Sequence, residues 1–192
     1  MERADAARNR ARILEAAERL FAAKGAPNVT MEDIARAAGV GRGTLYRRYP
    51  DRAAIATAML DEHEKALQRE LIGGRPPLGP GATPARRLAA FYAAMVGLLE
   101  SHSHLVLGAE TGRSRFATGA YGFWRAHVRS LLVAADVPDP DALVEIALAP
   151  LAPEVYTFQR EGRGLGPERI TAALEELALR LLAGHAPPAG DG

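Results

Sequence analysis

The sequence contains no cysteine, and this absence removes several chemistries at once. Disulfide bonds, thiol catalysis and cysteine-ligated zinc are all excluded. No apolar run approaches the roughly 18 residues that a membrane-spanning helix requires. The N-terminal stretch MERADAARNRAR is charged and lacks the apolar segment of a secretory signal. From these absences we expect a cytoplasmic protein.

Catalytic signatures are also missing. The chain has no G-x-S-x-G and no H-E-x-x-H motif, and the glycines of 162–166 are too closely spaced for a phosphate-binding loop. His102 and His104 flank an expected helix end, but no ligand spacing around them is diagnostic of a metal site, so a hydrated loop is favoured. We therefore expect no metal, no cofactor and no enzyme activity. An all-α hydrolase or metal enzyme is a distant alternative.

The composition and the distribution of charge point elsewhere. Of the 192 residues, 48% are hydrophobic, which is enough for the core of one large domain or two small ones. Residues 1–55 hold 11 Lys and Arg against 7 Asp and Glu, whereas residues 56–192 hold 13 against 16. A basic excess at one end of a nearly neutral chain is typical of a small nucleic-acid-binding module.

The first half of the chain shows helical punctuation. An apolar stripe predicts a helix over 6–24 that ends at Gly25. Thr30 and Asp33 form a capping-box-like start for a short second helix, which ends at Gly39. A glycine turn then leads into a third helix from Arg42 to about Tyr49, and Asp51 is placed to cap a fourth helix that runs to about Ile72. Short helices joined by a tight turn match the helix-turn-helix unit.

The segment GVGRGTLYRRYPDR (39–52) carries the most informative pattern. On a helical wheel Gly41, Leu45 and Tyr49 face inward. Two sets of residues remain for the surface: Gly43, Thr44, Tyr46 and Arg47 face outward, with Arg42 and Arg48 on the flanks. Guanidinium groups, hydroxyls and a bare glycine are what reading of a DNA major groove and contact with phosphates require. An ordinary helical corner with a charged face is the alternative.

The second half is predicted to be helical throughout. The Gly/Pro-rich stretch 73–84 must be a loop, and Thr83 can cap the helix that follows it. Further helices are expected over 103–112, 115–135, 141–160 (kinked by its prolines) and 167–183, before a disordered tail at 184–192. Because no strand-type alternation is found, the expected fold is all-α, with a DNA-binding domain at 1–55 and a larger helical domain at 56–192.

Residues 13–60 resemble the DNA-binding domain of the TetR family of bacterial transcriptional regulators. The resemblance is carried by I-L-x-A-A-x-x-L-F-x-x-x-G, T-x-x-x-I-A-x-x-A-G-V and G-T-L-Y-x-x-Y. It implies two sets of DNA contacts: Arg42, Gly43, Thr44 and Arg47 would face base edges, and Thr30, Tyr46, Arg48 and Arg52 would contact phosphates. The family usually has a capping side chain at Gly41, and His-Phe with a later Lys at Arg48-Tyr49 and Arg52. These departures leave the base preference open. For Arg8, Arg10 and Arg12 a solvated helix face and a contact with DNA remain equally open.

The resemblance also implies a ligand-responsive, sequence-specific regulator of double-stranded DNA, most often a repressor released by a small organic molecule. A DNA-binding protein without an inducer is the alternative. The implied effector pocket draws on aromatic and apolar residues of the second domain, any of which could instead be plain core: Phe91, Tyr92, Met95, Leu99, Phe116, Tyr121, Trp124, His127 and Tyr156.

The resemblance further implies a homodimer built from the helices at 141–160 and 167–183, reading a near-palindromic operator. The leucines of the last helix, Leu174, Leu177, Leu181 and Leu182, are compatible with such an interface because they exceed what one small domain needs to bury. The identity of the effector, the operator and the regulated genes does not follow from the sequence.

Overall fold

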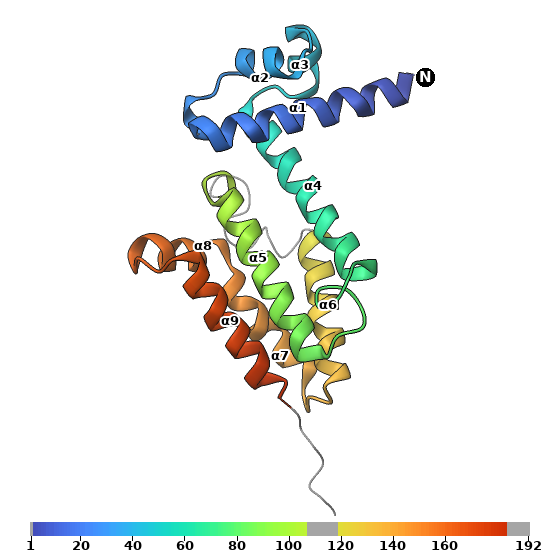
Figure 1. Ribbon diagram of the computed structural model, residues 1–192, viewed down its shortest axis with the longest axis vertical. Coiled ribbons are helices and arrows are strands. Elements are labelled where there is room, and N and C mark those ends of the chain that lie inside the picture. Colours follow the sequence, from blue (N-terminus) through green and yellow to red (C-terminus); the bar gives the residue numbers. More distant parts are fainter. Residues whose placement is uncertain (1, 107–118, 184–192) are drawn as a thin grey trace, which may run out of the picture. The chain divides into compact units, whose positions relative to one another are not determined.

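The computed structural model describes residues 2–106 and 119–183, and within these ranges every regular element is helical (Figure 1). The chain divides into two compact units, Met1–His63 and Glu64–Gly192. An all-α fold was expected from the sequence, and the described residues confirm it. No described helix is both long enough and apolar enough to cross a membrane.

The first unit contains three helices and the beginning of a fourth. Helix α1 (Glu2–Lys24) starts earlier than the sequence predicted and is followed by Gly25, whose positive φ of 75° favours glycine. A 3-10 turn follows at Ala26–Asn28, and then come α2 (Met31–Ala38) and α3 (Arg42–Arg48). Helix α4 (Arg52–Gly73) begins in this unit and continues into the second.

The capping box predicted for α2 is present. The Thr30 hydroxyl accepts a hydrogen bond from the Asp33 backbone N–H at 3.1 Å, and the Asp33 carboxylate accepts from the Thr30 backbone N–H at 3.2 Å. The carboxylate also accepts from the Thr30 hydroxyl at 2.7 Å. These bonds from Thr30, the side-chain one first, lower the pKa of Asp33. The reciprocal bonds satisfy N–H groups that a helix start leaves without partners.

Replacing Thr30 by alanine is therefore expected to lower the free energy of unfolding by about 1 kcal/mol and to raise the pKa of Asp33. Urea denaturation and an NMR pH titration would measure the two effects. Thr57→Ala is the matched control, because the Thr57 hydroxyl donates to the Ala53 carbonyl inside α4 at 3.0 Å and caps nothing. Equal loss of stability in the two variants would show that the box contributes nothing.

The core of the first unit explains why so short a helix as α3 is held in place. Leu45 is fully buried and Tyr49 is 4% exposed, as the helical wheel predicted, and both pack with Ile13, Ile34 and other apolar residues of α1, α2 and α4. The wheel was wrong for Gly41. This residue is exposed because it lies at the N-cap of α3, with an extended backbone outside the helical turn.

The second unit is built from α5 (Pro84–Val106), α6 (Gly119–Ala134), α7 (Pro140–Leu148), α8 (Pro153–Thr157) and α9 (Pro167–Leu181), together with the last part of α4. Helix α5 packs along α9 and α6 packs against α7 (Figure 1). Their apolar faces enclose one core cluster that includes Phe91, Tyr92, Val128 and Leu132. Thr83 caps α5, as the sequence indicated, and Asp139 caps α7.

One predicted helix is broken rather than kinked. Instead of a continuous helix over 141–160, α7 ends at Leu148 and a 3-10 turn covers Ala149–Leu151. Helix α8 then restarts at Pro153, and a π-helical turn follows at Phe158–Gly162. Pro150 and Pro153 lack the N–H that a continuing helix needs, and the residue before Pro153 takes an extended conformation.

The helix expected at 103–112 is, up to Val106, the last turn of α5. Residues 107–118, which include Phe116, and the tail at 184–192 lie outside the described residues. The expectations for these segments stay predictions.

Candidate nucleic-acid interface

Helices α2 and α3 and the turn between them form a helix-turn-helix unit. Gly39 closes α2 in the left-handed conformation, with φ 61° and ψ 40°, and its N–H donates to the carbonyls of Ala35 and Arg36. A Cβ at this position would lie 2.5 Å from Nη2 of Arg12, which donates to the Gly39 carbonyl at 3.2 Å. The left-handed backbone conformation favours glycine at the turn, whereas the Arg12 side chain could move aside for a Cβ.

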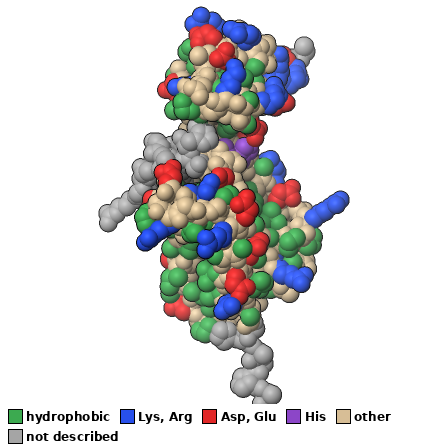
Figure 2. Space-filling model, turned by 60° about the vertical axis from the view of Figure 1, so that its left-hand side comes forward, with side chains coloured by type: hydrophobic (Ala, Val, Ile, Leu, Met, Phe, Trp, Pro, Cys, Tyr) green, Lys and Arg blue, Asp and Glu red, His purple; other side chains and the backbone are tan. Residues whose placement is uncertain are grey.

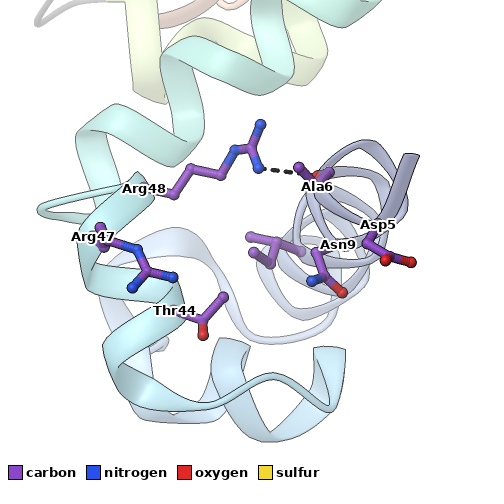
Figure 3. A pocket seen from close by; sticks show the side chains of 7 residues that line it. Asp5, Ala6, Asn9, Thr44, Arg47 and Arg48 are labelled. Carbon is purple, nitrogen blue, oxygen red and sulfur yellow. Dashed lines mark hydrogen bonds between the residues drawn. The ribbon is translucent and has the colours of Figure 1, made fainter. Parts of the chain in front are cut away.

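The outer face of α3 opens onto a cavity of about 570 Å³ between α1 and α3. Figure 3 shows Thr44 and Arg47 of α3 on one side of it and Asn9 and Asp5 of α1 on the other. Among the described residues Arg47 has no hydrogen bond or ion pair, and its side chain is exposed. Its guanidinium is therefore available to a partner outside the chain.

Arg48 ties α3 back to the start of α1. Its Nη1 donates to the carbonyl of Ala6 at 3.0 Å, which Figure 3 marks with a dashed line. The family resemblance assigns Arg48 to a phosphate. In this structure one of its five N–H groups is already engaged, and the others can still serve a phosphate oxygen.

Arg42 and Tyr46, also expected at DNA, share one carboxylate oxygen of α2. Nη2 of Arg42 lies 2.6 Å from Oε1 of Glu32, and the Tyr46 hydroxyl donates to the same oxygen at 3.3 Å. The Arg42 and Glu32 side chains are 70% and 39% exposed, so the pair lies at the surface. The sequence pattern does not indicate this role for Glu32, because its partners are 10 and 14 positions away on another helix.

A second network joins α1, the end of α3 and α4. Arg10 donates to the Tyr49 hydroxyl at 3.0 Å through Nη1 and to Oε1 of Glu62 at 2.8 Å through Nη2. The hydrogen bond to Glu62 is the main reason that the pKa of Arg10 is raised. A phenylalanine in place of Tyr49 could not accept from Arg10, so this link depends on a residue in which the chain departs from the usual family pattern. For Arg10 and Arg12 the structure shows contacts within the protein, and Arg8 pairs with Asp5.

Arg52, the last of the expected phosphate contacts, holds the 3-10 turn. Its Nη1 donates to the carbonyls of Ala26, Pro27 and Val29 at 2.8, 2.9 and 2.9 Å. Because one nitrogen contacts three carbonyls, this side chain ties the 3-10 turn to the start of α4. Contact with a phosphate stays a prediction, and it would have to use the remaining N–H groups.

The residues expected to line an effector pocket are largely brought together in the core of the second unit. Phe91 lies with its ring centroid 5.9 Å from that of Trp124 and 5.5 Å from that of His127. Buried members are Phe91, Tyr92, Met95, Leu99, Trp124 and Tyr156. A pocket among these residues stays a prediction. A groove of about 900 Å³ beside α5 and α9 is lined by other residues, such as Pro77, Ala90 and Leu179.

Three tyrosines of this set have polar partners that fix their rings. The hydroxyl of Tyr92 donates to the Ala147 carbonyl at 2.8 Å, and that of Tyr121 donates to Glu145 at 2.8 Å. The Tyr156 hydroxyl donates to Glu100 at 2.5 Å, and Arg160 donates to the same carboxylate through two nitrogens at 2.9 Å each. Burial raises the pKa of Tyr92 to about 12, while the bonds from Arg160 and then Tyr156 lower the pKa of Glu100.

The described residues contain no group of three or more His, Asp or Glu side chains that could hold a metal ion. His102 is buried in the second unit, and the side chain of His104 lies outside the described residues.

The helix-turn-helix unit and its basic outer face define the first unit as a DNA-binding head. A family model described as "Bacterial regulatory proteins, tetR family" matches residues 13–59. An HTH-type transcriptional regulator of Mycobacterium tuberculosis is 32% identical over 138 residues, which cover 70% of this chain and 66% of that protein. The chain belongs to the TetR family of bacterial transcriptional regulators. It spans slightly less than two thirds of the length of this relative.

One further relative matches the first part of the chain, and two solved structures share the fold. The regulator TtgR of Pseudomonas putida is 44% identical over 61 residues, or 31% of this chain and 29% of TtgR. A transcriptional regulator from Rhodococcus sp. has a TM-score of 0.64 at 16% identity, covering 91% of this chain and 96% of its own. A regulator from Saccharomonospora viridis, solved in complex with choline, has a TM-score of 0.64 at 21% identity, with 88% and 94% covered. At these identities the two structures show the shared fold alone.

Proposed function

We propose that the protein is a sequence-specific, double-stranded DNA-binding repressor that a small organic ligand releases from its operator. The observation that carries the proposal is the outer face of α3. There Arg47 is exposed without a partner among the described residues, while Leu45 and Tyr49 anchor the helix in the core. An unpaired guanidinium on a helix that the core holds in place is suited to hydrogen bonding with guanine. Such a repressor would work in the cytoplasm, where its DNA lies.

A homodimer through the α7–α8 segment and α9 is part of the proposal. Apolar side chains on these elements remain exposed: Ile146 at 66%, Val155 at 37%, Phe158 at 56%, Leu177 at 42% and Leu179 at 42%. Figure 2 shows hydrophobic side chains among the charged ones on the visible face of the second unit. Two of the leucines named for the interface do not support it, because Leu174 of α9 and Leu182 just after it are buried in the chain's own core. A twofold dimer would read a near-palindromic operator.

The ligand would act by favouring one arrangement of the two heads. Helix α4 is continuous from Arg52 to Gly73 and contains residues of both units, so it is suited to carry such a shift. The coupling equals the ligand's difference in affinity for the two arrangements, typically about 1–3 kcal/mol. The expected pocket around Phe91 and Trp124 would offer a small organic molecule aromatic surroundings.

Selection of genomic DNA fragments by the purified protein at two salt concentrations tests the proposal. We expect the sequenced fragments to share a near-palindromic motif that survives the higher salt, because base contacts do not depend on counterion release. Recovery of random fragments that are lost at higher salt would show phosphate binding alone. That outcome would remove the main support for a sequence-specific regulator.

A further inference from the structure

Glu32 is the acidic residue with which α3 forms an ion pair among the described residues. Its Oε1 forms an ion pair with Nη2 of Arg42 at 2.6 Å and accepts a hydrogen bond from the Tyr46 hydroxyl at 3.3 Å. An acidic side chain on the DNA-facing side of a basic head weakens the attraction to phosphates. Glu32 lies in the first turn of α2, where the helix N-terminus favours an acidic side chain, and it also lies between two expected DNA contacts.

We propose that Glu32 is a specificity-determining residue: it holds Arg42 toward a base edge and disfavours binding through phosphates alone. The proposal rests on the proposed function, since it concerns how the DNA-binding head discriminates between sequences. Arg42 lies at the first position of α3, which is the end that enters the major groove in helix-turn-helix proteins.

The geometry allows Arg42 to keep Glu32 while it reads a base. A guanidinium has five N–H groups in a planar fork, so Nη2 can stay on Glu32 while others donate to guanine O6 and N7. The carboxylate also fixes the long side chain in one direction, which reduces the entropy lost on binding. On a preferred sequence, the pair and the base contact are thus compatible.

On any other sequence the same pair is a disadvantage. Without a suitable base, Arg42 gains most by turning to a phosphate, and the Glu32 carboxylate is then left beside the negatively charged backbone. The repulsion between two unit charges at about 4 Å in water corresponds to roughly a fivefold change in affinity. Glu32 would therefore weaken non-specific binding more than specific binding.

The test compares Kd for the selected fragment and for a scrambled fragment, using the full chain and fluorescence anisotropy. In Glu32→Gln we expect the scrambled fragment to bind about fivefold more tightly, with little change for the selected one, so that discrimination falls by the same factor. Glu15→Gln is the matched control. It removes the same charge from the same unit, at a 69% exposed side chain that pairs only locally with Arg19. It should leave discrimination unchanged.

Repeating the Glu32→Gln substitution in a protein that lacks the Arg42 side chain separates the proposed role from a general charge effect. In Arg42→Ala, adding Glu32→Gln should no longer lower discrimination, because the guanidinium that Glu32 directs is gone. An unchanged ratio in Glu32→Gln, an equal fall in Glu15→Gln, or a fall that persists without Arg42 would each overturn the proposal. Glu32→Asp, which keeps the charge but is shorter, should also lower discrimination. If the wild-type protein itself fails to discriminate, the proposed function fails first, and the two failures are therefore distinguishable.

Discussion

Arg47→Ala is expected to weaken binding to the selected DNA fragment by about 5- to 150-fold, since a guanidinium paired with a base is worth about 1–3 kcal/mol of discrimination. Arg47 faces the cavity between α1 and α3 and makes no hydrogen bond or ion pair with any described residue (Figure 3). Its removal leaves no buried group without a partner, so the fold should be unaffected.

The dependence of the Arg47→Ala effect on DNA sequence distinguishes base reading from phosphate contact. Loss of Arg47 should relax the base preference at one position of each half-site, while binding to scrambled fragments changes little. A repeat of the fragment selection with the variant would measure this directly. Arg19→Ala is the control, because it removes the same charge from an exposed site on α1. Equal weakening on all fragments would contradict a base-reading role and would assign Arg47 to a phosphate instead.

The features of the first unit that were predictable from sequence are local ones. The capping box of Thr30 and Asp33, the glycines that end α1 and α2, and the burial of Leu45 all follow from residue preferences within a few positions. Such signals are strong because the backbone requirement is met by only a few residue types. They placed the helix-turn-helix unit correctly, and contact of its outer face with DNA stays a prediction.

The contacts that organise the outer face were not predictable in the same way. Glu32 meets Arg42, and Arg48 meets the carbonyl of Ala6, across 10 and 42 positions of the chain. A helical wheel indicates the direction of a side chain but not the partner that another helix brings to it. The family pattern assigns Arg48 and Arg52 to phosphates. The structure shows in addition that both side chains donate hydrogen bonds to backbone carbonyls of the chain itself.

The second unit shows a further limit of pattern reading. The segment 141–160 has helical periodicity, but two prolines divide it into separate short elements. Likewise, an apolar residue on the apolar face of a helix can pack in the chain's own core or remain exposed for contact with a second protein chain. Leu174 is buried and Leu177 is 42% exposed, although both lie on α9, and only packing distinguishes them.

His127 leads to the second large effect, which is a dependence of stability on pH. Its ring lies beside Phe91, and its buried Nε2 has no hydrogen-bond partner among the described residues. Burial, and secondarily the positive charge of Arg87 on α5, lower the pKa of His127 from its ordinary value of 6.5 to about 4. The folded protein thus keeps this imidazole neutral under conditions in which the unfolded chain would protonate it.

The sign of the effect follows from the number of protons bound in each state. Well above pH 6.5 His127 is neutral whether the chain is folded or unfolded, so its protonation does not alter stability. Between pH 6.5 and about 4 the unfolded chain binds the proton and the folded chain does not, so stability falls as the pH falls. After allowance for partial exposure of the ring, the loss should be about 2 kcal/mol.

Urea denaturation at pH 7 and at pH 4.5 would measure this loss, with Trp124 fluorescence as the signal. Trp124 is the single tryptophan of the chain and lies three residues before His127 on α6, so it reports on the second unit. His127→Leu should remove this part of the pH dependence. It should retain the part that arises from Glu100, Asp141 and Glu145, whose pKa values are lowered by their arginine partners. Parallel stability curves for the wild type and the variant would mean that the folded protein already accepts a proton on His127. The imidazole would then have an acceptor or a path to water, and it would be a better candidate for binding an acidic effector than for closing an apolar core.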